Sequence, residues 1–188
     1  MSCLSFHSSL GSEPSAGLLT QNALQRWKGT CAYDGTDFLG WQSQLKGPTL
    51  QDCLEAQLAK ILKQTVRVHG SGRTDAGVHA HGQVFHFDAV WPHAPEALFR
   101  ALSGRLPSGF QLRSLTPVAL NFHARFSAHS KRYRYVLYQG SPPPMHTRFC
   151  WAVPYPLDQK AMEIAAGHLL GRHNFRAFSA HRGEGNCL

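Results

Sequence analysis

Short runs in which hydrophobic and polar residues alternate indicate β-strands at several places in the chain. The range Arg26–Tyr33 has apolar side chains at alternate positions, which fall on one face of a strand because successive side chains point to opposite faces. The two phenylalanines of Gln83–Asp88 share a face in the same way. Patterns of this kind predict three further strands, over Val66–His69, Phe110–Leu115 and Arg132–Tyr138.

Apolar residues three and four positions apart predict a helix that begins after Thr49, with Asp52 at the capping-box position. The apolar stripe of this helix consists of Leu50, Cys53, Leu54, Leu58, Ile61 and Leu62. A short helix is predicted over Pro95–Leu102, and a last helix is expected between a capping Asp158 and a stop at Gly171. We expect the last helix to bury Met162, Ala165, Ala166, Leu169 and Leu170.

Strands and helices alternate along the chain, but some predicted strands follow one another closely. This arrangement favours an α+β fold over a doubly wound α/β fold. Residues 1–25 are Ser-rich and carry no Lys or Arg, so we interpret them as a flexible leader and not as a secretory or transit peptide. The Ser141–Pro144 segment reads as a linker, which divides the rest into a domain over residues 26–140 and a second segment over residues 141–188.

Composition adds a preference for an anionic partner. The 188 residues are 43% hydrophobic and 16% charged, as in folded proteins, and the net charge is +8. Residues 97–157 contain no Asp or Glu and eight Lys or Arg, while the eleven basic residues elsewhere equal the eleven acidic ones. A charge excess confined to one segment is typical of a nucleic-acid-binding face, although a basic surface without function is the plainer alternative.

The five cysteines form no C-x-x-C pair and are odd in number, which fits free thiols in a reducing cytoplasm better than a disulfide framework. No apolar run has the length that a membrane-spanning helix needs.

The segment Ser71–His79 is the richest in candidate chemistry. Asp75 lies between small residues and glycines, where a ligand can approach the backbone closely. Arg73, two positions earlier, would point to the same side in an extended loop and could hold the carboxylate ionised and nucleophilic. The alternative is a structural turn in which Asp75 bonds its own backbone and Arg73 is solvated.

Two other groups of residues suggest binding. His79, His81 and His86 could ligate a metal, although their spacing matches no known zinc motif. Basic and aromatic residues interleave in Phe122–Arg125 and in Lys131–Tyr135, where cations would neutralise phosphates and rings would stack on unpaired bases. The alternative for the second segment is an ordinary strand whose tyrosines fill a core.

Four blocks of the sequence, in order, resemble the TruA-type tRNA pseudouridine synthases. The resemblance rests on Tyr33–Gln42, on Gly72–His79 with the following Gly82–Phe87, on Phe122–Ala128 with Arg132–Tyr135, and on Leu169–Gly171 with Asn174–Phe175. The second block is the most specific to this family. The resemblance implies a pseudouridine synthase fold with a ferredoxin- or RRM-like αβ half and a mixed, mainly antiparallel sheet.

The same resemblance implies isomerisation of uridine at positions 38 to 40 in the anticodon stem-loop of tRNA, by a cytoplasmic homodimer without metal or cofactor. By position, Asp75 matches the catalytic aspartate, Arg73 the arginine that displaces the target base, and Tyr133 the tyrosine packed against that base. Arg125, Lys131 and Arg132 are the expected RNA-binding residues.

The family pattern continues beyond its fourth block, so we expect a chain that lacks the C-terminal half, in which residues 141–188 begin a truncated second domain. Three functions are compatible with the sequence: the enzyme itself, an inactive RNA-binding fragment of it, and a metal hydrolase that uses the three histidines.

Overall fold

The computed structural model describes residues 23–178, which form two compact units that meet in sequence between Arg132 and Tyr133. Most of the expected leader and the last ten residues lie outside the described part. The division into residues 26–140 and 141–188 stays a prediction.

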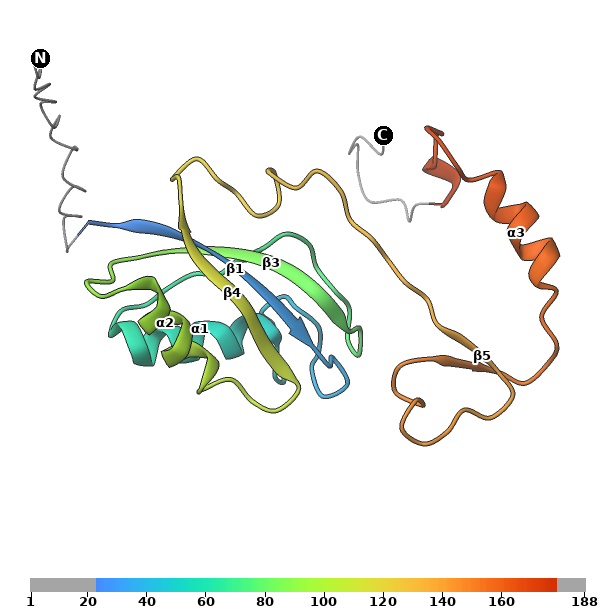
Figure 1. The fold of residues 1–188 in the computed structure, drawn as a ribbon, viewed down its shortest axis with the longest axis horizontal. Helices are drawn as coiled ribbons and strands as arrows, with labels where there is room; N and C mark the ends of the chain where they lie inside the picture. Colours follow the sequence, from blue (N-terminus) through green and yellow to red (C-terminus); the bar gives the residue numbers. More distant parts are fainter. Residues whose placement is uncertain (1–22, 179–188) are drawn as a thin grey trace, which may run out of the picture. The chain divides into compact units, whose positions relative to one another are not determined.

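The first unit follows a βαββαβ path. Its elements are β1 (Gln25–Tyr33), α1 (Leu50–Leu62), β2 (His69–Gly70), β3 (Ala80–Ala89), α2 (Pro95–Ser103) and β4 (Phe110–Val118). The four strands form one sheet in the order β2-β3-β1-β4, and every neighbouring pair is antiparallel. Both helices cover the same face of this sheet (Figure 1). The path and strand order are those of a ferredoxin-like half, so the expected α+β fold with a mainly antiparallel sheet is confirmed.

The core lies between the helices and the sheet. Leu50, Leu54 and Leu58 of α1 are fully buried, as the helical spacing predicted, and Cys53 is partly buried. The cap also forms as predicted, because the Thr49 side chain accepts the Asp52 amide hydrogen at 3.2 Å. From the sheet, the largest buried side chains are Trp27, Tyr33, Phe85, Phe87 and Phe110.

The open face of the sheet is partly covered by the chain that follows β4. Arg26 of β1 makes a double ion pair with Asp88 of β3, at 2.7 and 2.6 Å. The same guanidinium donates to the carbonyl oxygens of Leu120 and Phe122. Lys28 of β1 stands over the Phe122 ring, 5.5 Å from its centroid. One charged pair thus ties the segment after β4 to the sheet.

The second unit contains a parallel pair of short strands, β5 (Leu137–Gln139) and β6 (Trp151–Val153). It also contains α3 (Gln159–Gly167) and a 3₁₀ turn over Arg176–Phe178. None of the helices within residues 23–178 is long and apolar enough to cross a membrane.

Two predictions for this unit are wrong. The alternating segment Arg132–Tyr138 forms a strand only from Leu137 onward. The Val136 carbonyl oxygen still accepts the Trp151 amide hydrogen at 2.7 Å, but residues 132–135 pair with no strand of the described chain. The last helix does begin at the Asp158 cap, whose carboxylate accepts the Ala161 amide hydrogen at 2.9 Å, but it ends at Gly167 and buries no side chain. Periodicity shows which residues share a helix face, whereas burial needs a surface to pack against.

Candidate functional site

Asp75 lies in the loop that joins β2 to β3. Its side chain is exposed, as is that of Arg73. The loop closes through a hydrogen bond from the Val78 amide to the Asp75 carbonyl oxygen, 3.2 Å long. Gly77 takes up a φ of +76° inside this turn, where any other residue would be strained. The sequence therefore presents the carboxylate at the tip of a tight turn.

Two buried polar side chains fix the start of the loop. Gln83 of β3 donates to the Gly72 carbonyl oxygen at 2.6 Å and accepts the Ser71 hydroxyl hydrogen at 2.8 Å. Tyr33 at the end of β1 shares a 2.9 Å hydrogen bond with the Thr74 hydroxyl. Burial raises the pKa of Tyr33 to about 12, so its hydroxyl stays neutral at ordinary pH. Both contacts anchor the loop to strands, and strands are rigid supports for a reactive group.

A second loop, after β1, packs against the first. The Trp41 amide donates to the Thr74 carbonyl oxygen at 2.9 Å, and the Gly77 amide donates to the Phe38 carbonyl oxygen at 3.3 Å. Gly40 has a φ of +93°, and a Cβ at this position would lie only 2.5 Å from the Thr74 oxygen. The two loops approach so closely that only glycine fits between them.

An open pocket of about 390 Å³ lies between the two loops. Its lining consists of Leu39, Gln42, Gln44, Arg73, Thr74, Asp75 and Ala76. Arg73 and Asp75 share the pocket, but the ion pair that we expected between them is not present among the ion pairs of residues 23–178. The guanidinium is thus left available for another anion, such as a phosphate.

The expected RNA-binding residues are exposed. Arg125, Lys131 and Arg132 belong to the first unit, and a Cβ on Gly72 would lie 3.1 Å from the Lys131 ammonium nitrogen. Lys131 therefore reaches the loop that carries Asp75. Tyr133 is the first residue of the second unit and its side chain is 72% exposed.

The three histidines proposed as metal ligands do not come together. The Nδ1 atom of His79 lies 3.0 Å from an Asp34 carboxylate oxygen and 3.1 Å from the Gly35 amide nitrogen. His81 is exposed, and His86 packs elsewhere. Within residues 23–178, no group of three or more His, Cys, Asp or Glu side chains has the arrangement of a metal site.

His86 instead belongs to a cluster that the sequence analysis missed. Its ring centroid lies 5.0 Å from that of His69 and 4.6 Å from that of His123. The Nδ1 atom of His86 accepts the Ala124 amide hydrogen at 3.2 Å. Because the three histidines come from β2, β3 and the segment after β4, their spacing in sequence carried no signal of the cluster.

We expect this cluster to make stability depend on pH. Burial, the neighbouring His123 and His69, and Arg26 lower the pKa of His86 from 6.5 to about 4, although Asp88 opposes the shift. Between these values the unfolded chain binds a proton that the folded chain does not, so stability is expected to fall as pH falls from 6.5 to 4. The slope from this one group is at most about 1.4 kcal/mol per pH unit.

Urea unfolding at a series of pH values measures this slope. His86→Asn keeps an acceptor for the Ala124 amide without a titrating ring, so we expect it to flatten the slope over this range. His81→Asn, on the exposed part of the same strand, is the matched control and should leave the slope in place. Equal slopes for the parent and His86→Asn would contradict the interpretation.

Comparison with known proteins agrees with this fold. A family described as tRNA pseudouridine synthase matches residues 30–127, which include both loops of the pocket. The chain is 47% identical to tRNA pseudouridine synthase A of Alcanivorax borkumensis over 149 residues, covering 78% of this chain and 55% of that protein. It is 42% identical to tRNA pseudouridine synthase A of Streptococcus pneumoniae over 159 residues, covering 84% of this chain and 64% of that protein.

The chain thus spans between about half and two thirds of the length of these relatives. The family match covers more than half of the chain and includes the end of β1, both helices and β4. Identity above 40% over most of the chain extends the likeness beyond the matched range. The chain belongs to the tRNA pseudouridine synthase family.

Proposed function

We propose that this chain carries the catalytic aspartate of an enzyme that isomerises uridine to pseudouridine at positions 38 to 40 in the anticodon stem-loop of tRNA. The observation that supports this most is the placing of Asp75. Its exposed carboxylate lies in an open pocket between two loops that backbone hydrogen bonds join. The named relatives are tRNA pseudouridine synthases, which supports tRNA as the substrate.

The reaction breaks the N1–C1′ bond of uridine, turns the uracil and joins C5 to C1′. The proton on C5 leaves and N1 gains one, so the product is an isomer. A carboxylate at Asp75 would attack C1′ or C6, or stabilise positive charge on the ribose. Stacking hides these atoms, so the target nucleotide must first turn out of the anticodon arm, at a cost of a few kcal/mol.

Arg73 and Tyr133 are proposed to bind the substrate. Arg73 lines the pocket without an ion pair to Asp75, so its guanidinium is free to contact the RNA backbone or to fill the space that the uridine leaves. Tyr133 would pack its ring against the uracil while it turns. We further propose a cytoplasmic enzyme that acts as a homodimer on one tRNA.

The second candidate is an RNA-binding chain without turnover. The observation that favours it is the openness of the pocket, which the described residues line with two loops only. A tRNA transcript with tritium at C5 of its uridines separates the two candidates. Release of tritium to water during incubation with the chain supports the enzyme, whereas binding of the transcript without release supports the second candidate.

RNA binding is expected to depend steeply on salt, with a log–log slope of roughly −0.7 to −0.9 per neutralised phosphate. Changing Arg125, Lys131 and Arg132 together to Ala should flatten that slope by about two or three units, because three cations would no longer displace counterions. Fluorescence anisotropy of a labelled anticodon-arm hairpin over a salt series measures it. The matched control changes three exposed basic residues in or just after the two helices to Ala, namely Lys60, Arg100 and Arg105. Equal flattening in both variants would contradict the assignment.

A further inference from the structure

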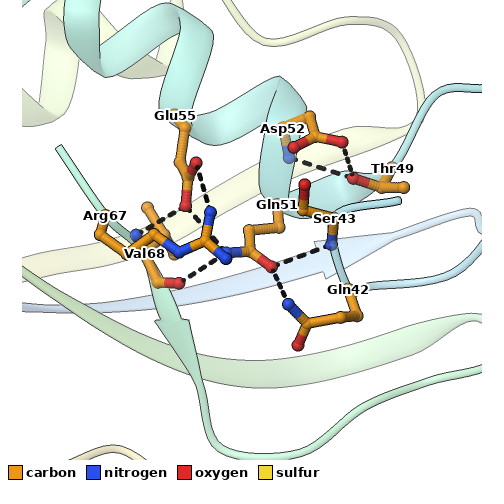
Figure 2. A network of polar contacts seen from close by, with 8 residues as sticks. All are labelled: Gln42, Ser43, Thr49, Gln51, Asp52, Glu55, Arg67 and Val68. Carbon is orange, nitrogen blue, oxygen red and sulfur yellow. Dashed lines mark hydrogen bonds and ion pairs between the residues drawn. The ribbon is translucent and has the colours of Figure 1, made fainter. Parts of the chain in front are cut away.

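A hydrogen-bond network runs from the buried part of α1 to the wall of the pocket (Figure 2). Glu55 of α1 stands at one end of this network. One of its carboxylate oxygens accepts hydrogen bonds from the Gln51 side-chain nitrogen at 2.8 Å and from the Val68 backbone amide at 2.9 Å. The other oxygen pairs with Arg67 at 3.4 Å. With three donors directed at it, the carboxylate acts as an acceptor only.

The acceptor character of Glu55 determines which way the Gln51 amide faces. Gln51 is 2% exposed, and its nitrogen also donates to the Val68 carbonyl oxygen at 3.1 Å. A carboxylate and a carbonyl both require a donor, so the Gln51 nitrogen must face them. The Gln51 oxygen therefore faces the opposite side, where it accepts the Ser43 amide hydrogen at 3.0 Å.

The orientation of the Gln51 side-chain amide in turn determines that of the Gln42 side-chain amide. The Gln51 oxygen also accepts from the Gln42 side-chain nitrogen, at 2.9 Å. Gln42 must present its nitrogen to this oxygen, so its own Oε1 faces away from the network, as Figure 2 shows. Among the described residues no donor hydrogen-bonds to Oε1, and Gln42 lines the same pocket as Asp75. Gln42 thus brings an acceptor to the pocket wall, and the buried network excludes the opposite orientation of its side-chain amide.

We propose that Gln42 Oε1 accepts the N3–H hydrogen of the target uracil and is the residue that selects uracil over cytosine. The inference rests on the proposed function, since it names the group that reads the base in that pocket. Uracil carries a donor at N3, whereas cytosine carries a lone pair there. An acceptor on the wall binds the first and repels the second, and a site built for a hydrogen bond rejects the analogue that lacks it.

Neither Gln83 nor Gln44 is as well suited to this role as Gln42. Both functional groups of Gln83 are already used by Gly72 and Ser71. Gln44 is exposed, and its nitrogen donates to the Leu39 carbonyl oxygen of the same loop, with no buried group behind it. Gln42 alone among the three combines a place in the pocket wall with an orientation that buried partners impose.

The test measures the affinity of the chain for four anticodon-arm hairpins that differ at one target nucleotide. The nucleotides are uridine, 3-methyluridine, cytidine and 2′-deoxyuridine. For the parent we expect weaker binding of the 3-methyluridine and cytidine hairpins, by about five- to tenfold, as for the loss of one hydrogen bond. The 2′-deoxyuridine hairpin should bind like the uridine hairpin. In Gln42→Met, which keeps the length of the side chain without an acceptor, the first three hairpins should bind within about twofold of one another.

Gln64→Met is the matched control, because Gln64 also makes one side-chain hydrogen bond, to the Val90 carbonyl oxygen, and does not line the pocket. It should discriminate like the parent. Gln51→Leu should lose discrimination although it substitutes no residue of the pocket wall, since Gln42 is then no longer oriented. If this variant fails to fold by circular dichroism, Gln42→Met decides alone.

Three results would overturn the inference. Equal binding of all four hairpins by the parent chain would overturn the inference but leave the proposed function in place. Discrimination that persists in Gln42→Met would assign the reading of the base to another group. Loss of affinity for the 2′-deoxyuridine hairpin alone, abolished by Gln42→Met, would assign Gln42 to the ribose hydroxyl. If the chain binds no RNA hairpin at all, the proposed function fails as well, so the two failures are distinguishable.

Discussion

Asp75→Asn is expected to lower the rate of uridine isomerisation by about a thousandfold or more, while RNA affinity stays close to that of the parent. Asn keeps the shape of the side chain but has no negative charge, so it neither attacks carbon nor stabilises a cationic ribose. Within the described residues the Asp75 side chain makes no hydrogen bond or ion pair, so the substitution breaks no contact of the fold. Tritium release from C5-labelled tRNA measures the rate, and hairpin anisotropy measures the affinity.

Asp37→Asn is the matched control for this experiment. Asp37 is an exposed carboxylate in the neighbouring loop and does not line the pocket. Its replacement should leave the rate unchanged, and the melting temperatures of both variants should match that of the parent. Arg73→Ala is expected to slow the reaction without abolishing it, because it removes a contact to RNA and not the reacting group. Turnover by Asp75→Asn at even a tenth of the parental rate would remove Asp75 from the catalytic role.

Gly40→Ala is expected to have the largest effect on the fold of the site. The backbone at Gly40 has a φ of +93°, and the new Cβ would lie 2.5 Å from the Thr74 carbonyl oxygen and 3.1 Å from the Asp75 carbonyl carbon. Both neighbours are backbone atoms and cannot turn aside as a side chain would. We expect a loss of about 3 kcal/mol in the free energy of unfolding, or separation of the two loops and loss of activity.

Gly109→Ala separates backbone strain from collision. Gly109 has a similar φ of +80°, but its Cβ would meet only the Asp34 Cβ, at an ordinary contact distance of 3.5 Å. The expected cost is about 1 kcal/mol from the left-handed conformation alone. Urea unfolding compares the two variants. Equal costs would mean that the approach of the two loops contributes nothing to the restriction at Gly40.

The sequence by itself determined most elements of the first unit, although β2 covers His69–Gly70 and not the predicted Val66–His69. The strand at Arg26–Tyr33, the helix after Thr49 and the strand that contains Phe85 and Phe87 all form, because alternation and helical spacing are local properties that one core satisfies together. The blocks that carry the family resemblance could also be recognised from the sequence, because each is a contiguous stretch of chain. Membership in the family is confirmed, whereas the roles of Asp75, Arg73 and Tyr133 stay predictions.

Only the tertiary structure decided how polar groups from different elements meet. The Gln42–Gln51–Glu55 relay joins a loop to a helix, Gln83 joins β3 to the loop that carries Asp75, and the histidine cluster joins three separate segments. Contacts between separate segments also explain why Arg132–Val136 does not form the predicted strand. A strand needs a partner strand, which its own alternating pattern does not encode. Periodicity reports which face a residue shares with its neighbours in sequence. Which group lies opposite that face depends on contacts between segments far apart in the chain.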